Sequence, residues 1–256
     1  MIPHYYLDLT SIGLVGNYGV NDVPVVTDPK AEGVRTIMPV NTWLKPSGTQ
    51  LTVSLQWPRA VPYKPGQGTV TAQIFRADPN SEVPVAAEVL AEVVWPAPGT
   101  PEEYPQRVRV PFNLPASVAT QLWNEAPVLP PLTDVDKAAL LALVERFRQA
   151  LISGNPEEAY GFMKYKFEDF ARAEGHTVAS IREVVLEQYQ EMLAEPNRES
   201  APLTADMAVF DLVAGSRLVR IARPNDREAV IIETENSQYS FVLYATKIAE
   251  SWTLVR

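Results

Sequence analysis

The first half of the chain alternates apolar and polar residues with a period of two, the pattern of strands that bury one face. The alternation is clearest in residues 51–57 and 108–114, whose apolar members are Leu51, Val53, Leu55, Trp57, Val108, Val110, Phe112 and Leu114. A turn, Pro46-Ser47-Gly48-Thr49, predicts a hairpin between residues 34–44 and 51–57. Pro111 cannot donate to a neighbouring strand, so its segment is expected at a sheet edge. Many short strands separated by such turns predict an all-β sandwich.

From Asp134 onward the apolar pattern changes to the period of an α-helix. Three amphipathic helices are predicted, with the stripes Leu140, Val144, Phe147 and Leu151, then Tyr160, Met163, Phe167 and Phe170, then Ile181, Val185, Tyr189 and Met192. Gly154-Asn155-Pro156 predicts the end of the first helix and the start of the second. Strand-like segments follow between Met207 and Val255. Helices followed by a curved antiparallel sheet predict an α+β domain.

Proline usage separates the two patterns. Residues 1–126 hold 16 of the 23 prolines and residues 127–256 hold 7. Between the patterns lies the stretch from Ala126 to Leu132, which contains the pair Pro130-Pro131. Paired prolines neither continue a helix nor fit a central strand. We therefore predict two domains, a β-sandwich over residues 1–125 and an α+β domain over residues 134–256, joined by a proline-rich linker over 126–133.

The charge balance is acidic in both halves. The formal net charge is −9, with 8 basic and 11 acidic side chains in residues 1–126 and 14 and 20 in residues 127–256. Nucleic acid and anionic membrane surfaces require basic footprints, so neither is an expected partner. An acidic protein instead favours a basic protein partner and speeds the encounter with it. No apolar stretch is long enough to span a bilayer and no signal-peptide pattern begins the chain, so we expect a cytoplasmic protein.

Residue types that commonly carry catalysis are scarce. The chain has no cysteine, and its two histidines are His4 and His176. Disulfides, thiolate sites and multi-histidine metal sites are therefore excluded or disfavoured, and no metal or other cofactor is expected. No Gly-x-Ser-x-Gly elbow or His-x-x-x-His pair occurs either. These absences leave enzymatic activity undecided and favour a protein that is not an enzyme.

Residues 147–160, with Gly154-Asn155-Pro156 inside them, and residues 239–255, with Trp252 after a turn, resemble parts of one known family. They are similar to the first helix pair and the last hairpin of the nuclear transport factor 2-like (SnoaL-like) superfamily, although Ser251 stands where the family has glycine. The resemblance covers about residues 134–256. It implies a cone of three helices on a curved antiparallel sheet around a pocket, and a homodimer formed through that sheet. Family members include isomerases, dehydratases, hydrolases and pure binding domains, so the fold does not decide the function.

Enzymes of that family place Asp, His or Tyr side chains in the cone, and the second half offers three weak catalytic candidates. His176 lies in a Gly-His-Thr break, where helix capping and solvent exposure also explain it. Asp211 begins a predicted strand. Glu233 follows two isoleucines, where burial could raise its pKa for use as a base, but the solvent face of an alternating strand also explains it and is the favoured interpretation. The candidates for lining a pocket are Tyr160, Tyr165, Tyr189 and Tyr239. Aromatic residues at helical spacing more often fill a core.

A run of four basic residues, Arg217, Arg220, Arg223 and Arg227, stands out in the second half. On a strand Arg217 and Arg223 share one face and Arg220 takes the other, so the run does not form a continuous phosphate groove. Ion pairs with nearby acidic side chains are its expected role.

Three functions compete. The favoured one is a non-catalytic protein-binding or accessory protein, such as a bacterial immunity or adaptor protein acting on a basic partner. The alternative is a small-molecule binder or enzyme of the isomerase or dehydratase type that uses the cone pocket. The third is carbohydrate binding by exposed tryptophans of the N-terminal sandwich, which holds four of the five, Trp43, Trp57, Trp95 and Trp123. Core packing is the competing explanation for those rings.

Overall fold

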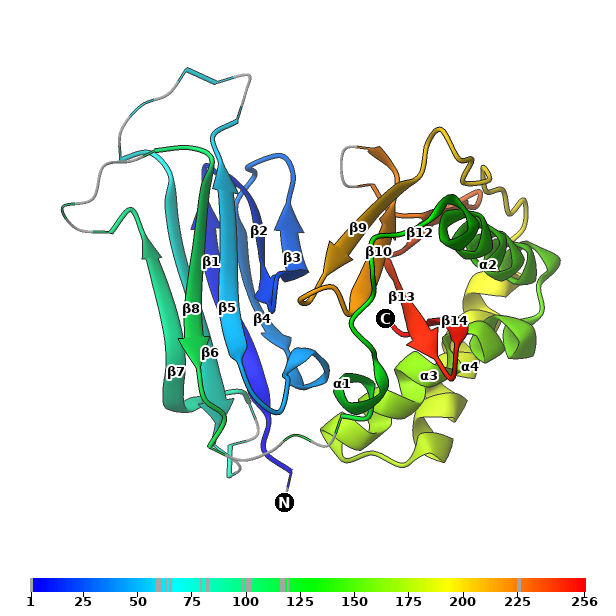
Figure 1. Ribbon diagram of the computed structural model, residues 1–256, viewed down its shortest axis with the longest axis horizontal. Coiled ribbons are helices and arrows are strands. Elements are labelled where there is room, and N and C mark those ends of the chain that lie inside the picture. The colour runs from blue at the N-terminus through cyan, green and yellow to red at the C-terminus, as the bar shows by residue number, and fades with distance from the viewer. Residues whose placement is uncertain are drawn as a thin grey trace. The chain divides into compact units, whose positions relative to one another are not determined.

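A computed structural model describes residues 2–58, 61–62, 64, 66–78, 80–81, 83–97, 99, 103–115, 118, 120–224 and 227–256. The chain divides into two compact units, Met1–Thr120 and Gln121–Arg256. The first unit is rich in β-strands, and the second combines helices with antiparallel strands (Figure 1). Both halves therefore have the secondary-structure class that the hydrophobic periodicity predicts.

The first unit contains two four-stranded antiparallel sheets, with the strand orders β4-β1-β6-β7 and β3-β2-β5-β8 (Figure 1). Alternate side chains of each sheet are buried, as Leu51, Val53 and Leu55 show at 1 % exposure or less. Two antiparallel sheets with buried inner faces are the arrangement of a β-sandwich. The strands are β1 (Tyr5–Ile12), β2 (Val15–Val20), β3 (Val23–Asp28), β4 (Val34–Pro39), β5 (Thr49–Gln56), β6 (Thr69–Ala77), β7 (Ala86–Trp95) and β8 (Gln106–Phe112), and a short 3-10 helix, η1 (Asn41–Trp43), precedes β5.

The predicted hairpin between residues 34–44 and 51–57 is wrong. β4 pairs with β1 in one sheet, while β5 pairs with β2 and β8 in the other. Asn41, which is buried just after β4, holds this part of the chain against the start of β1. Its side-chain oxygen accepts a hydrogen bond from the Tyr5 backbone at 2.8 Å, and its amide donates to the Pro3 carbonyl at 2.9 Å. The turn at residues 46–49 therefore connects two sheets instead of two neighbouring strands.

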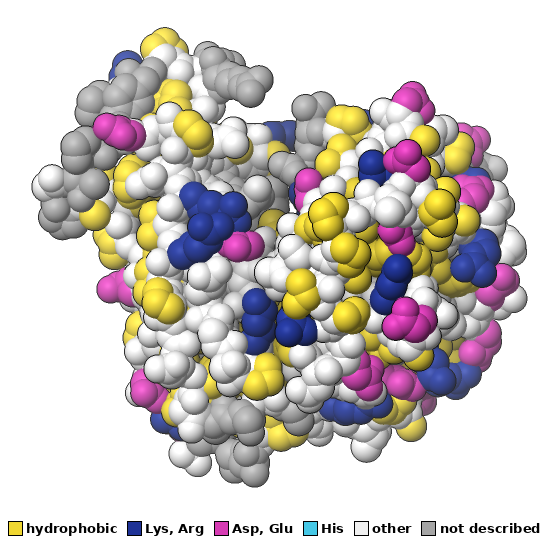
Figure 2. Space-filling model, viewed as in Figure 1, with side chains coloured by type: hydrophobic (Ala, Val, Ile, Leu, Met, Phe, Trp, Pro, Cys, Tyr) yellow, Lys and Arg dark blue, Asp and Glu magenta, His cyan; other side chains and the backbone are white. Residues whose placement is uncertain are grey.

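β8 lies at the edge of its sheet, so the edge position predicted from Pro111 is confirmed. Its polar positions Arg107 and Arg109 both contact Asp22, at N···O distances of 2.8 and 2.9 Å. Figure 2 shows basic side chains beside an acidic one over this part of the sheet. Burial would raise the pKa of Asp22, but the two guanidinium groups outweigh it and hold that pKa below its usual value. This ion-pair cluster ties the β2–β3 turn to β8.

In the described residues the second unit begins with one short helix and three long ones and ends with strands. The helices are α1 (Leu122–Glu125), α2 (Asp134–Ser153), α3 (Pro156–Glu174) and α4 (Val178–Ala194). β9 (Val209–Val213), β10 (Leu218–Ala222), β13 (Leu243–Ile248) and β14 (Ser251–Leu254) form a sheet of order β14-β13-β10-β9, and β11 (Val230–Glu233) pairs with β12 (Gln238–Phe241). None of the helices in the described residues is long and apolar enough to cross a membrane.

The junction between α2 and α3 forms where it is predicted. Gly154 ends α2 with a φ of 75°, in the left-handed region that glycine adopts without strain. Asn155 then caps α3 by accepting a hydrogen bond from the Glu158 backbone at 3.2 Å, and Pro156 occupies the first helical position. The two helices therefore follow each other directly.

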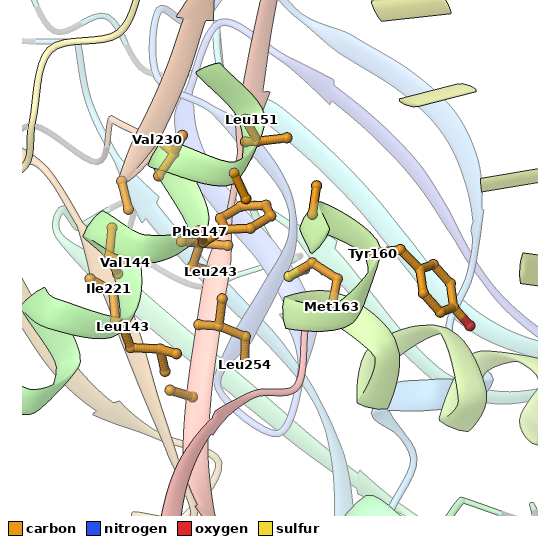
Figure 3. Close-up of a cluster of buried hydrophobic side chains, with 14 of the residues drawn as sticks. Leu143, Val144, Phe147, Leu151, Tyr160, Met163, Ile221, Val230, Leu243 and Leu254 are labelled. Carbon is orange, nitrogen blue, oxygen red and sulfur yellow. The ribbon is translucent and has the colours of Figure 1, made fainter. Parts of the chain in front are cut away.

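The core of the second unit lies between its helices and strands. The stripe of α2, Leu140, Val144, Phe147 and Leu151, is at most 1 % exposed. Figure 3 shows Val144, Phe147 and Leu151 of this stripe in one cluster with Met163 of α3 and with Ile221, Val230, Leu243 and Leu254 of the strands. Phe147 also contacts the rings of Phe162 and Phe241, with centroids 6.2 and 5.4 Å apart. Each such side chain contributes roughly 1.5–3 kcal/mol by burial, so this cluster supplies the main stabilisation of the unit.

The residues predicted as a linker, 126–133, belong to the second unit. The division of the chain falls earlier, between Thr120 and Gln121. Leu129 is 5 % exposed within the core cluster, and its backbone N–H donates to the Ser216 carbonyl at 2.7 Å. The Arg217 guanidinium donates to the carbonyl of Ala126. The prolines keep this segment extended, while these contacts hold it on the surface of the unit.

Candidate functional site

The three candidate catalytic residues lie on different elements, and all three are exposed. His176 lies between α3 and α4, with its ring stacked on Phe170 at a centroid distance of 6.3 Å. Asp211 lies on β9, 3.8 Å from the Arg220 guanidinium. Glu233 lies at the end of β11. A base whose pKa is raised by burial needs a buried carboxyl, and Glu233 does not have that environment.

Two of the candidate tyrosines pack in an aromatic cluster. Tyr160 stacks on Phe167 with centroids 5.8 Å apart and planes within 8°, and Phe167 meets Tyr189 edge-on at 6.5 Å. Burial raises the pKa of both Tyr160 and Tyr189. These rings therefore pack against one another as part of the core, which is the explanation that their helical spacing favours.

The other two tyrosines donate hydrogen bonds to glutamates on separate elements. The Tyr165 hydroxyl donates to Glu125 of α1 at 2.8 Å, and burial together with that carboxylate raises the pKa of Tyr165. The Tyr239 hydroxyl donates to Glu195, which raises the pKa of Tyr239. The four tyrosines thus divide between core packing and two separate hydrogen bonds.

A groove with a volume of about 640 Å³ lies between two segments of the second unit, residues 199–207 and residues 223–224 with 227–233. The backbones of Glu199 and Glu233 exchange two hydrogen bonds of 2.9 Å, which hold the first segment beside β11. Val230 and Ile232 of β11 point into the core, so the alternate residues, Ile231 and Glu233, point towards the groove. Of the candidate residues, Glu233 is the one that lines it.

Arg223 is the buried charge of this groove, at 7 % exposure. Its guanidinium donates to the Ala201 carbonyl at 2.6 Å. Burial, and then the neighbouring cations of Arg227 and Arg148, lower the pKa of Arg223. Arg148 has its own counter-charge, because it binds the Glu145 carboxylate at 2.6 and 2.8 Å. Within the described ranges, no carboxylate lies within 4.0 Å of the guanidinium of Arg223 or Arg227.

The arginine run therefore behaves only partly as predicted. Arg220 lies near an acidic partner, Asp211, whereas Arg217 donates to a backbone carbonyl. Arg223 and Arg227 line the groove together with Glu199 and Glu233. The sequence signal for this site was the arginine run itself, but the pairing of Glu199 with Glu233 joins residues too far apart for a local pattern to reveal.

A second charged feature lies on α4. Glu183, Glu187 and Glu191 are exposed and follow one another at a spacing of four, which places them along one side of the helix. We call these three residues the α4 ridge. In the described part of the chain none of them has a basic partner within ion-pair distance. The opposite face of α4 buries Val185, Leu186, Tyr189, Met192 and Leu193. The spacing of these glutamates is present in the sequence, but a prediction from apolar stripes alone does not include it.

No three His, Asp or Glu side chains of the described residues gather as ligands for a metal ion. Comparisons of the chain with protein-family models, with curated proteins and with solved structures find no match. The structure is therefore a β-rich unit followed by an α+β unit that carries a charged groove and the α4 ridge.

Proposed function

We propose that this chain is a non-catalytic binding protein that docks a basic partner protein on the α4 ridge. The observation that carries the proposal is the ridge itself: three carboxylates, each one helical turn from the next, that have no basic partner within ion-pair distance among the described residues. Like charges at this spacing destabilise a helix by roughly 0.2–0.5 kcal/mol per pair. A basic partner would turn that repulsion into attraction, and the net charge of −9 would speed its approach.

The surroundings of the ridge suit a protein partner. Val184, between the first two glutamates in sequence, is 48 % exposed. An exposed apolar side chain next to a row of carboxylates offers both the desolvated contact and the charge pairing of a protein interface. A bacterial immunity or adaptor protein acting on a basic partner is the class that this combination fits.

We also propose that the second unit is nuclear transport factor 2-like. Three main helices precede an antiparallel sheet, and the direct junction at Gly154-Asn155-Pro156 supports the likeness. So does Trp252, which follows the turn between β13 and β14 and has the Lys247 ammonium 5.1 Å from its ring centroid. Such domains serve as binding modules as readily as enzymes.

The two alternative functions have less support from the structure. Side chains of the core cluster pack the space between the helices and the strands, so the small-molecule alternative moves from a cone pocket to the groove. For carbohydrate binding, exposed coplanar tryptophans are needed, and all five tryptophans are buried or half-buried. Trp57 and Trp95 pack on Tyr104, at centroid distances of 5.8 and 6.1 Å.

Capture with a ridge variant tests the proposal. The full chain and the variant E183Q/E187Q/E191Q are immobilised, exposed to the same lysate, and their bound proteins are identified by mass spectrometry. The matched control is E103Q/E235Q/E250Q, which removes the same charge from exposed positions elsewhere. We expect a basic protein that binds the wild type and the control, is lost with the ridge variant, and is released by added salt. Equal retention by the ridge variant would contradict the proposal.

A further inference from the structure

We propose that the groove of the second unit binds a small zwitterionic ligand, such as an amino acid or a short peptide. The ligand carboxylate would lie at Arg223 and its ammonium group at Glu199 and Glu233. This site is separate from the α4 ridge and does not depend on the partner proposed for it.

The carboxylate end is argued from a buried cation that lacks a counter-charge. A guanidinium has five N–H donors, and the bond to the Ala201 carbonyl is the one hydrogen bond that the described residues give the Arg223 guanidinium. Burying a charge without a partner is costly. A carboxylate would accept two of the remaining donors in the forked geometry that arginine favours. Arg227, exposed on the same wall, adds a second positive charge.

A second, independent observation comes from Ser200, which also lines the groove. Its hydroxyl oxygen is buried and has no hydrogen-bond partner among the described residues. Buried hydroxyls without a partner are uncommon in folded proteins and mark places where a ligand or water completes the bonding. Ser200 directly precedes Ala201, whose carbonyl the Arg223 guanidinium binds, and all three residues line the groove.

The ammonium end is argued from two facing carboxylates. Glu199 and Glu233 are directly opposite in an antiparallel bridge, with backbone hydrogen bonds of 2.9 Å in both directions. Directly opposite residues project to the same side, and like charges there repel. Both side chains line the groove and are exposed. An ammonium group between them would remove the repulsion and gain charge-assisted hydrogen bonds.

The space between the two ends is lined in part by Ile231 and Met207. A volume of about 640 Å³ lies within the usual range of small-molecule sites, about 300–1,000 Å³. Gln238 donates a hydrogen bond of 3.4 Å to Glu233 but carries no charge. A simple anion would leave the two glutamates without a counter-charge, and a simple cation would leave Arg223 without one. A ligand with both charges and an apolar body is therefore the chemistry that this groove matches.

Titration of the full chain with four probes tests the ligand class. L-leucine and the dipeptide Leu-Leu carry both charges, leucinamide lacks the carboxylate, and N-acetylleucine lacks the ammonium group. With calorimetry or amide chemical shifts, we expect one of the zwitterions to bind and its blocked derivatives to bind about tenfold more weakly. The proposal is overturned if neither zwitterion binds up to about 10 mM, or if the blocked derivatives or inorganic phosphate bind as tightly.

Variants then place the site. R227Q and E233Q change exposed side chains, so both should fold, and each should weaken zwitterion binding roughly five- to tenfold. R172Q, at an exposed arginine of α3, is the matched control and should bind as the wild type does. R223M tests the buried cation directly, and if it does not fold the two exposed variants still decide. Unchanged affinity in both R227Q and E233Q would contradict the placement, whereas the α4 ridge variant should bind the zwitterion normally.

Discussion

Two buried arginines of the second unit illustrate how the partner of a charged residue indicates its role. Arg256 is 4 % exposed and binds the Asp169 carboxylate at 2.6 Å. Asp169, which is fully buried, also accepts hydrogen bonds from the backbones of Gln121 and Leu122 at 2.6 and 3.3 Å. That network stays within the fold and joins the C-terminal residue to the start of α1. Arg223, at 7 % exposure, has a carbonyl in place of a carboxylate, which is why we assign it to a ligand.

The Asp169 network predicts a large loss of stability on substitution. In D169N the Arg256 guanidinium stays buried without its counter-charge, so the free energy of unfolding should fall by about 3–5 kcal/mol. Urea denaturation of the full chain measures it. D134N is the control, because it removes an ion pair that is exposed to solvent, between Asp134 and Lys137 at 3.5 Å. Its free energy of unfolding should fall by at most about 1 kcal/mol. A loss in D169N no larger than in D134N would show that the pair is not structurally important.

The capping box at the start of α2 predicts a lowered pKa for the Asp136 carboxyl group. The Thr133 hydroxyl and backbone donate to Asp136 at 2.7 and 3.1 Å, and together with Lys247 they lower the pKa of Asp136 from 3.8 to about 2. Because the folded value is the lower one, the stabilisation is complete above pH 3.8 and is lost as the pH falls towards 2. Carboxyl NMR titration should give this midpoint, and T133A should move it upward. A wild-type midpoint near 3.8 would show that the hydrogen bonds from Thr133 do not stabilise the Asp136 carboxylate.

At the scale of elements, the sequence predicts what local pattern determines. The α2 stripe and the Gly154-Asn155-Pro156 junction are correct because helix contacts recur within one or two turns. The partner of β4 is not predictable in this way, since the bonds of Asn41 to Pro3 and Tyr5 join distant parts of the chain. The candidate site fails for the same reason. Glu233 is placed in the groove by Glu199, far earlier in the chain, and not by burial on its own strand.

The α4 ridge yields a stabilising prediction. Glu187 has a like charge four residues away on each side, Glu183 and Glu191, whereas Glu183 has one such neighbour. Removing the charge in E187Q should therefore raise the free energy of unfolding by about 0.4–1 kcal/mol, and E183Q should raise it by about half as much. Urea denaturation checks both values, and the gains should shrink in about 1 M salt. If E187Q is no more stable than E183Q, the ridge is not under mutual repulsion.

For the whole molecule, proline content and contacts place the boundary between the two units at different residues. Proline content places a linker at residues 126–133, because prolines prevent regular structure. Contacts instead place the division before Gln121. The backbone N–H of Gln121 donates a hydrogen bond to the Asp169 carboxylate, and Leu129 packs in the core of the second unit. A proline-rich segment can be a docked strap as well as a connector, and composition does not distinguish the two. We therefore expect a C-terminal fragment that begins at Gln121 to be more stable than one that begins within the proline-rich segment.

Truncation separates these boundaries. We expect the fragments 1–120 and 121–256 each to unfold cooperatively in urea when followed by far-ultraviolet circular dichroism. The shorter fragment 127–256 lacks the Gln121 and Leu122 donors, leaving the buried Asp169 with fewer hydrogen bonds, so it should be less stable than 121–256 by roughly 1.5–3 kcal/mol. Equal stability of the two C-terminal fragments would restore the boundary predicted from proline content. If 121–256 is unfolded while the full chain folds, residues 121–256 are not an independent folding unit, which would contradict the division before Gln121.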